Sequence, residues 1–136
     1  MLNQYFLNIS VLVFTFHLSA LFVTSWHCRG SYTPHIGNQA LCQPDLVNRT
    51  LKICTGTSCS NKATNTGFVL MKNCIWNDRP NVRGTSQQQC VSYDWDTDEG
   101  ADGQGAYACT NNGKHNYLCD VDPKTTGVIT CDDCQP

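Results

Sequence analysis

The residues of this 136-residue chain with the most varied possible chemistry are its ten cysteines. Thiols can pair as disulfides, bind zinc or perform redox catalysis, and their spacing and surroundings favour one of these chemistries. The cysteines are Cys28, Cys42, Cys54, Cys59, Cys74, Cys90, Cys109, Cys119, Cys131 and Cys134. An even number in an exported chain predicts five disulfides, but the spacing leaves their pairing open.

Two alternatives use the same sulfur atoms. The pairs Cys131-x2-Cys134 and Cys54-x4-Cys59 have spacings that could hold zinc. Histidines that could complete such a site are His27, His35 and His115. Redox catalysis at Cys131 and Cys134 is disfavoured because the two aspartates between them oppose thiolate formation. We favour disulfides, because export exposes thiols to oxidation.

An acidic stretch gives a candidate calcium loop, formed by Asp94, Asp96, Asp98 and Asp102. Alternating carboxylates are how calcium loops supply hard oxygen ligands. The stretch departs from the EF-hand pattern, because Glu99 stands where Gly is needed and Gly105 where a bidentate Glu is needed. We therefore favour a solvated acidic loop and assign no metal and no cofactor.

Constellations for catalysis are sparse. A nuclease-like set could be assembled from His35, Arg79, Glu99 and His115, but no spacing supports it. No nucleophile elbow, zinc-protease motif or phosphate loop is present in the sequence. We expect no catalytic activity.

Two further features point to binding or modification. Asn48-Arg49-Thr50 is an acceptor triplet for N-glycosylation, usable in a secreted chain. Aromatic residues are numerous: Trp26, Trp76, Trp95, Tyr32, Tyr93, Tyr107 and Tyr117. They could stack on sugars or anchor a protein partner, but a core short of Leu and Ile must use them for packing, which we favour.

The first 25 residues read as a signal peptide. The mostly apolar stretch 9–23 has the length of a signal-peptide core rather than of a membrane span. Val23 and Ser25 suit a cut after Ser25, and a cut after Ala20 is the second choice. A retained anchor is disfavoured because no basic cluster follows. We expect residues 26–136 to be a secreted, extracellular domain without a membrane span.

Composition limits the class of that domain. Residues 26–136 contain only sixteen Leu, Ile, Val and Phe, and the whole chain is 15% charged with net charge −2. Because so few aliphatic side chains cannot stabilise a fold alone, we expect the disulfides to decide whether the chain folds.

Charge is divided along the chain. Residues 26–90 carry net charge +5 and residues 91–136 net charge −7. This division favours attraction between the two segments within the fold over two separate charged faces. No nucleic-acid partner is expected.

Strand patterns dominate the rest. Val91, Tyr93 and Trp95 alternate with polar residues, stretch 68–71 is a short apolar run, and Leu51 and Ile53 form a shorter candidate. Pro44–Val47 could begin one helical turn. The sequence predicts a small disulfide-rich, mainly β domain with antiparallel sheets and little helix.

The clearest local prediction is a hairpin of residues 106–110 and 115–121 around Asn112-Gly113. Residues 128–131 would add the third strand of a C-terminal meander. With a two-residue turn, Cys109 faces Asn116 and Cys119 faces Ala106, so each cysteine should bridge elsewhere. A longer loop would restore a direct bridge between them.

The organisation of the chain resembles that of small secreted cysteine-rich effector candidates of plant-pathogenic, rust-type fungi. The residues concerned are Trp26-His27-Cys28-x-Gly30-x-Tyr32, Cys54-x-Gly56-x-x-Cys59 and Gly67-Phe68-Val69-Leu70-Met71-x-x-Cys74. The resemblance implies a disulfide-stapled β-rich protein that binds host components; some such effectors bind zinc. It carries over no catalytic residue.

We therefore expect a secreted effector-like binding protein, a host-interaction or virulence factor whose protein or glycan partner lies outside the secreting cell. A lectin-like carbohydrate-binding module is the first alternative, and a small secreted hydrolase such as a nuclease is the second.

The cysteine assignment can be tested on the secreted protein by alkylation under denaturing conditions and intact mass. We expect that none of the ten cysteines is alkylated, with or without a chelator, because sulfur in a disulfide does not react with the alkylating reagent. Four thiols that become reactive only after chelation would instead assign a zinc site.

Overall fold

The computed structural model describes residues 24–77, 86–97, 105–120 and 127–136. They form a mainly β, antiparallel structure, as predicted; the one helical element is a single 3-10 turn, η1 (Gly56–Ser58). The first strands are β1 (Trp26–His27), β2 (Ser31–His35), β3 (Gln39–Gln43), β4 (Lys52–Thr55) and β5 (Cys59–Asn61). The later strands are β6 (Val69–Trp76), β7 (Ser86–Asp96), β8 (Ala106–Asn111), β9 (Asn116–Cys119), β10 (Ile129–Cys131) and β11 (Cys134–Gln135).

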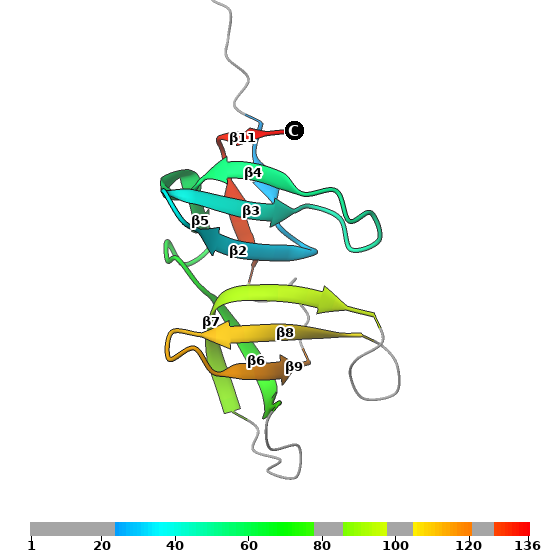
Figure 1. The fold of residues 1–136 in the computed structure, drawn as a ribbon. Coiled ribbons are helices and arrows are strands. Elements are labelled where there is room, and N and C mark those ends of the chain that lie inside the picture. Colours follow the sequence, from blue (N-terminus) through cyan, green and yellow to red (C-terminus); the bar gives the residue numbers. More distant parts are fainter. Residues whose placement is uncertain (1–23, 78–85, 98–104, 121–126) are drawn as a thin grey trace, which may run out of the picture.

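The strands form two bodies, one above the other in Figure 1. The upper body contains the strand order β11-β4-β3-β2 and the small sheet β1-β10-β5. In the lower body, each of β6, β7, β8 and β9 pairs with two of the others, so the four strands close into a ring. The lower body lies between β5 and β10 along the chain, and Cys74 of β6 pairs with Cys119 of β9.

Two bulges bend the lower body's strands. The register shifts between Met71 and Cys74, where Asn73 has φ +52°, and again between Cys90 and Ser92. Bulges increase local twist, which a small closed sheet requires. The second bulge also interrupts the predicted alternation in β7: Tyr93 is buried, whereas Val91 lies in the bulge and is half-buried.

The predicted hairpin is present as β8 and β9, but its register was wrong by one residue. Cys109 pairs with Tyr117 and Cys119 with Tyr107. The turn has three residues rather than two, because the backbone bends over residues 111–114 and Lys114 then takes φ +61°. The prediction that Cys109 and Cys119 bridge elsewhere is confirmed.

The predicted third strand of the meander is not beside this hairpin. Residues 129–131 form β10, which lies between β1 and β5 in the upper body. All three residues are buried, so this strand needs neighbours on both edges. The sequential meander that does occur is β7-β8-β9.

Of the predictions for short segments, one is confirmed, one is confirmed only in part and one is wrong. The apolar run at 68–71 opens β6, where Val69 and Met71 are buried. Ile53 lies in β4 but is 48% exposed, because Cys54 takes the buried face. Pro44–Val47 forms a bend, not a helical turn; the Asp45 side chain accepts hydrogen bonds there instead.

Sulfur and tyrosine fill the core. Nine of the ten cysteines are buried, as are Tyr32, Tyr93 and Tyr107. Among the described residues, the fully buried large aliphatic side chains are Val69, Met71 and Ile129. Each bridge typically contributes about 2–4 kcal/mol, and buried cystine sulfur also packs as apolar volume. Cystine and tyrosine therefore occupy the core volume that aliphatic side chains fill in most domains, and the prediction that the disulfides decide whether the chain folds stays a prediction.

The joint between the bodies depends on tyrosine rather than on sulfur. All ten cysteines are described, and none of the five bridges joins the upper body to the lower. The Tyr93 hydroxyl donates to the carbonyl of Cys28 at 2.7 Å and accepts from the backbone N–H of Ile129 at 3.1 Å. The Tyr107 hydroxyl donates to the carbonyl of Arg29 at 2.8 Å.

Backbone pairing reinforces the joint. Tyr32 and Ser31 of β2 pair with Tyr93 and Asp94 of β7, and the N–H of Trp95 donates to the carbonyl of Gly30 at 2.7 Å. The rings of Tyr32 and Tyr93 lie 6.2 Å apart. The β2–β7 pairing therefore joins the strands of both bodies into one eight-stranded sheet, and a single cluster of buried side chains includes residues of both.

Replacing the central phenol should weaken this joint. Tyr93→Phe leaves a buried carbonyl and a buried N–H without their partner, so we expect a loss of about 1–3 kcal/mol in urea unfolding with disulfides intact. Tyr117→Phe is the matched control, because its half-buried ring lies in β9 away from the joint, and it should change stability by less than about 0.5 kcal/mol.

The same variant has a pH signature. Burial raises the pKa of Tyr93 above its ordinary value of 10.0 and that of Tyr107 to about 12. The unfolded chain therefore loses these protons first, so stability should fall as pH rises above 10. The free energy of unfolding should fall less steeply with pH in Tyr93→Phe than in the wild-type protein. Equal slopes in the two proteins would contradict a raised pKa of Tyr93 in the folded state.

Candidate functional site

All ten predicted cysteines are paired, and no free thiol is present. The bridges are Cys28–Cys42, Cys54–Cys134, Cys59–Cys131, Cys74–Cys119 and Cys90–Cys109. The four cysteines of the zinc alternative do come together, but as the two crossed bridges Cys54–Cys134 and Cys59–Cys131. Disulfide sulfur offers no thiolate to a metal.

The acidic stretch is only partly described. Asp94 and Asp96 lie within β7, opposite Ala108 and Ala106, rather than in a loop that wraps an ion. Asp98 and Asp102 lie outside the described residues. Among the residues that are described, the groups of three candidate metal ligands are all cysteines already in bridges.

The nuclease-like set is not assembled by the described residues. His35 ends β2, whereas His115 lies beside β9 with its ring 5.5 Å from that of Trp76. Arg79 and Glu99 lie outside the described residues. His27, the third histidine, contacts the Thr130 hydroxyl at 3.0 Å.

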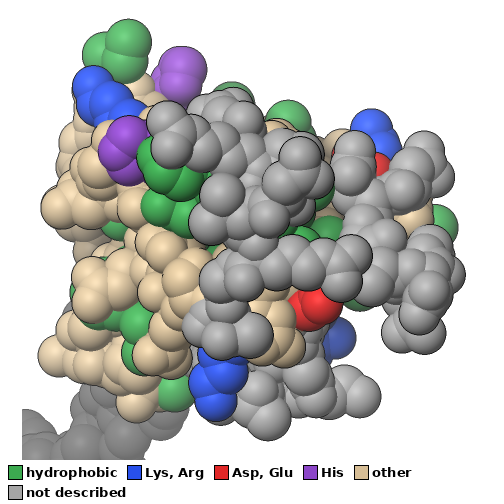
Figure 2. All heavy atoms as spheres, turned by 90° about the horizontal axis from the view of Figure 1, so that it is seen from below, with side chains coloured by type: hydrophobic (Ala, Val, Ile, Leu, Met, Phe, Trp, Pro, Cys, Tyr) green, Lys and Arg blue, Asp and Glu red, His purple; other side chains and the backbone are tan. Residues whose placement is uncertain are grey.

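Aromatic residues divide between core and surface. The packing interpretation is confirmed for the three buried tyrosines, and Trp95 also packs, with its ring 4.9 Å from that of Tyr107. Tyr117 and Trp76 form a half-buried pair, with ring centroids 6.2 Å apart. Figure 2 shows the molecule from below, where the described atoms are mostly uncharged and do not gather into a patch of one charge.

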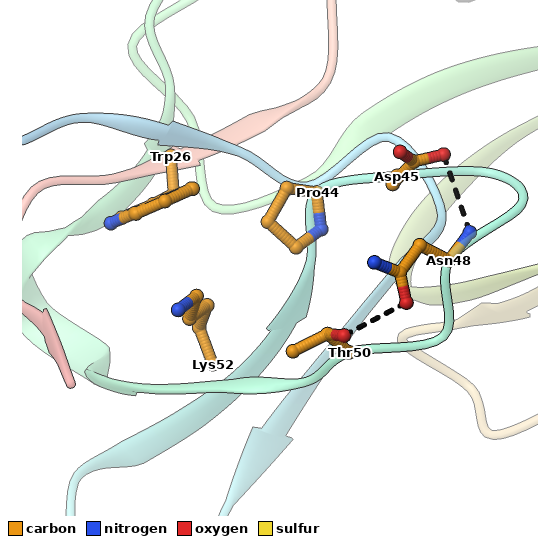
Figure 3. Close-up of a pocket in the computed structure, with 6 residues that line it drawn as sticks. All are labelled: Trp26, Pro44, Asp45, Asn48, Thr50 and Lys52. Carbon is orange, nitrogen blue, oxygen red and sulfur yellow. Dashed lines mark hydrogen bonds between the residues drawn. The ribbon is translucent and has the colours of Figure 1, made fainter. Parts of the chain in front are cut away.

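Trp26 instead borders a pocket of about 300 Å³ (Figure 3). Its other walls are Pro44 and Asp45, which follow β3, and Asn48, Thr50 and Lys52, which lead into β4. Lys52 pairs with Cys42 across the sheet, and its ammonium nitrogen lies 4.8 Å from the Trp26 ring centroid. The pocket thus offers an aromatic ring, a cation, hydroxyl and amide groups, and a carboxylate.

The wall of Asp45, Asn48 and Thr50 is held by local hydrogen bonds. Asp45 Oδ1 accepts from the backbone N–H of Val47 at 2.8 Å and of Asn48 at 3.4 Å. These bonds lower the pKa of the Asp45 carboxyl, so it stays ionised near neutral pH. The Thr50 hydroxyl donates to Asn48 Oδ1 at 2.9 Å, which fixes the orientation of the amide.

A second candidate surface, which we name the outer patch, consists of Leu41, Leu51 and Ile53. Leu41 of β3 pairs with Ile53 of β4, and Leu51 lies on the same side as Ile53 by strand alternation. Leu51 is 47% exposed and Ile53 48%. Because Lys52 faces the pocket, the outer patch lies on the opposite side of the sheet.

Neither surface was predicted as a unit from the sequence. Leu51 and Ile53 were predicted to form a short strand, but their exposed side was not assigned, although Cys54 in β4 marks the inner face. Asn48 and Trp26 were predicted as separate features, because nothing in their spacing indicates that they border one pocket.

Comparison with protein-family models, curated proteins and solved structures finds no match to this chain. In the described residues, no helix has the length and apolar character needed to cross a membrane.

Asn48 of the predicted glycosylation triplet is exposed, and its amide is oriented by Thr50. We expect the chain secreted from a eukaryotic host to carry an oligosaccharide by intact mass. Thr50→Val, which keeps the side-chain shape but removes the hydroxyl, and Asn48→Gln should both lose it while secretion continues. A wild-type protein secreted at its unmodified mass would refute the assignment.

Proposed function

We propose that this chain is a secreted, effector-like binding protein that acts outside the secreting cell by docking a protein of its host through the outer patch. Catalysis forms no part of the proposal. Five disulfides in so small a domain support an oxidising, extracellular site of action. The resemblance to cysteine-rich effector candidates supports a host component as the partner.

The observation that carries the proposal is where the scarce aliphatic side chains lie. Among the residues that the structure describes, the exposed large apolar side chains are Ile36, Leu46, Val47, Leu51 and Ile53, and four of these five fall within residues 46–53. A chain this short of aliphatic residues would gain stability by burying them. Their exposure in one segment is typical of a surface that a partner covers.

The charges of the segment suggest the partner's chemistry. Residues 46–53 contain Arg49 and Lys52 and no acidic residue. Lys52 lines the pocket on the other side of the sheet, whereas Arg49 is exposed. A complementary partner would present an apolar surface with an acidic residue for Arg49.

The proposed binding needs no cluster of catalytic side chains. These residues bring together no three His, Asp or Glu side chains at metal-binding distance. The apolar outer patch could supply binding energy by removing surface from water without any reactive group.

The proposal can be tested by site-specific photo-crosslinking in the native extracellular surroundings. A crosslinker at Leu51, a member of the outer patch that is 47% exposed, should label one discrete protein. The same crosslinker at Ile36, which is 87% exposed in the turn between β2 and β3, is the matched control and should not label it. Mass spectrometry identifies the labelled protein for purification.

Affinity measurements with the purified partner then test the outer patch itself. We expect Ile53→Ser to weaken binding at least tenfold, because a central apolar contact typically contributes more than about 1.4 kcal/mol. Ile36→Ser should leave the affinity unchanged. Equal labelling from both positions, or specific retention on a polysaccharide that is lost in Trp26→Ala, would overturn the proposal; the second result would assign a lectin-like function instead.

A further inference from the structure

The pocket beside Trp26 has the size and lining of a site for a single sugar residue. Its volume of about 300 Å³ is at the lower limit of the range of about 300–1,000 Å³ typical of ligand sites. The rings of Trp26 and Pro44 offer apolar faces for the C–H side of a pyranose, while Thr50, Lys52 and Asp45 offer partners for its polar groups.

One wall of this pocket is itself a sugar acceptor. Asn48 begins the triplet Asn48-Arg49-Thr50, and its Oδ1 is engaged by the Thr50 hydroxyl at 2.9 Å. Figure 3 shows the result: the Asn48 side-chain nitrogen points away from Thr50, over the pocket and toward Pro44, with Trp26 beyond. A group attached to that nitrogen would start at the mouth of the pocket.

From this geometry we infer that the pocket holds the first sugar of a glycan linked to Asn48. The sugar is an N-acetylated hexosamine, whose ring packs against Trp26 and Pro44 and whose polar groups meet Thr50 and Lys52. The inference rests on secretion, as the proposed function does, but it is independent of the protein partner, because the outer patch lies on the other side of the sheet.

The covalent step needs an activated oligosaccharide, supplied along the secretory route as a lipid-linked oligosaccharyl diphosphate. The Asn48 side-chain nitrogen forms a bond to the anomeric carbon of the sugar while the bond from that carbon to the diphosphate oxygen breaks. The amide loses one proton, and the lipid diphosphate leaves with the electron pair. No oxidation or reduction takes place.

Seating the sugar would have physical consequences. Lys52 already contacts the Trp26 ring, so the sugar must share that ring with the ammonium group or displace it. Protons of a sugar close to the indole would be shifted upfield by the ring current. The loop between β3 and β4, which otherwise depends on the Asp45 and Thr50 hydrogen bonds, would gain a contact to β1.

The decisive measurement is NMR on the full secreted chain whose glycan has been trimmed enzymatically to the single Asn48-linked sugar. We expect nuclear Overhauser effects between the sugar and the Trp26 indole, with upfield-shifted sugar protons. Trp26→Leu should abolish the upfield shift, whereas Trp76→Leu, in the lower body, should preserve it. A linked sugar with ordinary shifts and no contact to Trp26 would overturn the inference, and so would an unmodified Asn48.

A second arm separates a linked sugar from an external one. N,N′-diacetylchitobiose is titrated into Asn48→Gln and into the trimmed glycoprotein, and the Trp26 indole resonance is followed. A seated linked sugar should exclude the added disaccharide from the glycoprotein. Binding of the disaccharide to both proteins with the same Trp26 shift would show that the pocket serves external glycans and would overturn the inference. Neither result alters the crosslinking test of the outer patch.

Discussion

The arrangement of the two bodies depends on the contact where β2 pairs with β7 beside the buried hydroxyl of Tyr93. This hydroxyl bonds both to the carbonyl of Cys28 and to the N–H of Ile129, two residues that are far apart in the chain and adjacent in the upper body. The disulfides stabilise each body separately, three in the upper and two in the lower, by restricting the unfolded chain. The disulfides thus stabilise each body, and the buried Tyr93 hydroxyl helps to orient the two bodies relative to each other.

Much of the fold was predictable because composition and alternation are local properties. The cysteine count, the shortage of aliphatic residues and the strand patterns indicated a disulfide-rich β domain. The register of the hairpin was not predictable, because it depends on Lys114 adopting a left-handed backbone conformation that Asn112-Gly113 was expected to make unnecessary. The place of β10 depends on long-range pairing with β1 and β5, which no local pattern encodes.

The candidate sites divide in the same way. The acceptor triplet at Asn48 is a local pattern and could be found directly. The pocket around it also needs Trp26, which is placed there by the long-range pairing of β1 with β10 and by the Cys28–Cys42 bridge. The face of β4 could have been assigned from Cys54, since a bridged cysteine is a surer mark of the interior than an aliphatic residue in a chain with so much sulfur.

The position of the lower body within the chain has an evolutionary consequence. Its four strands follow one another in sequence, and the Cys74–Cys119 bridge connects its first strand to its last. A structural unit formed by one contiguous segment can be exchanged or duplicated between genes without a change in the strand topology of the rest of the chain. The acceptor asparagine and the outer patch belong to that scaffold, so the two halves of the molecule are free to diversify at different rates.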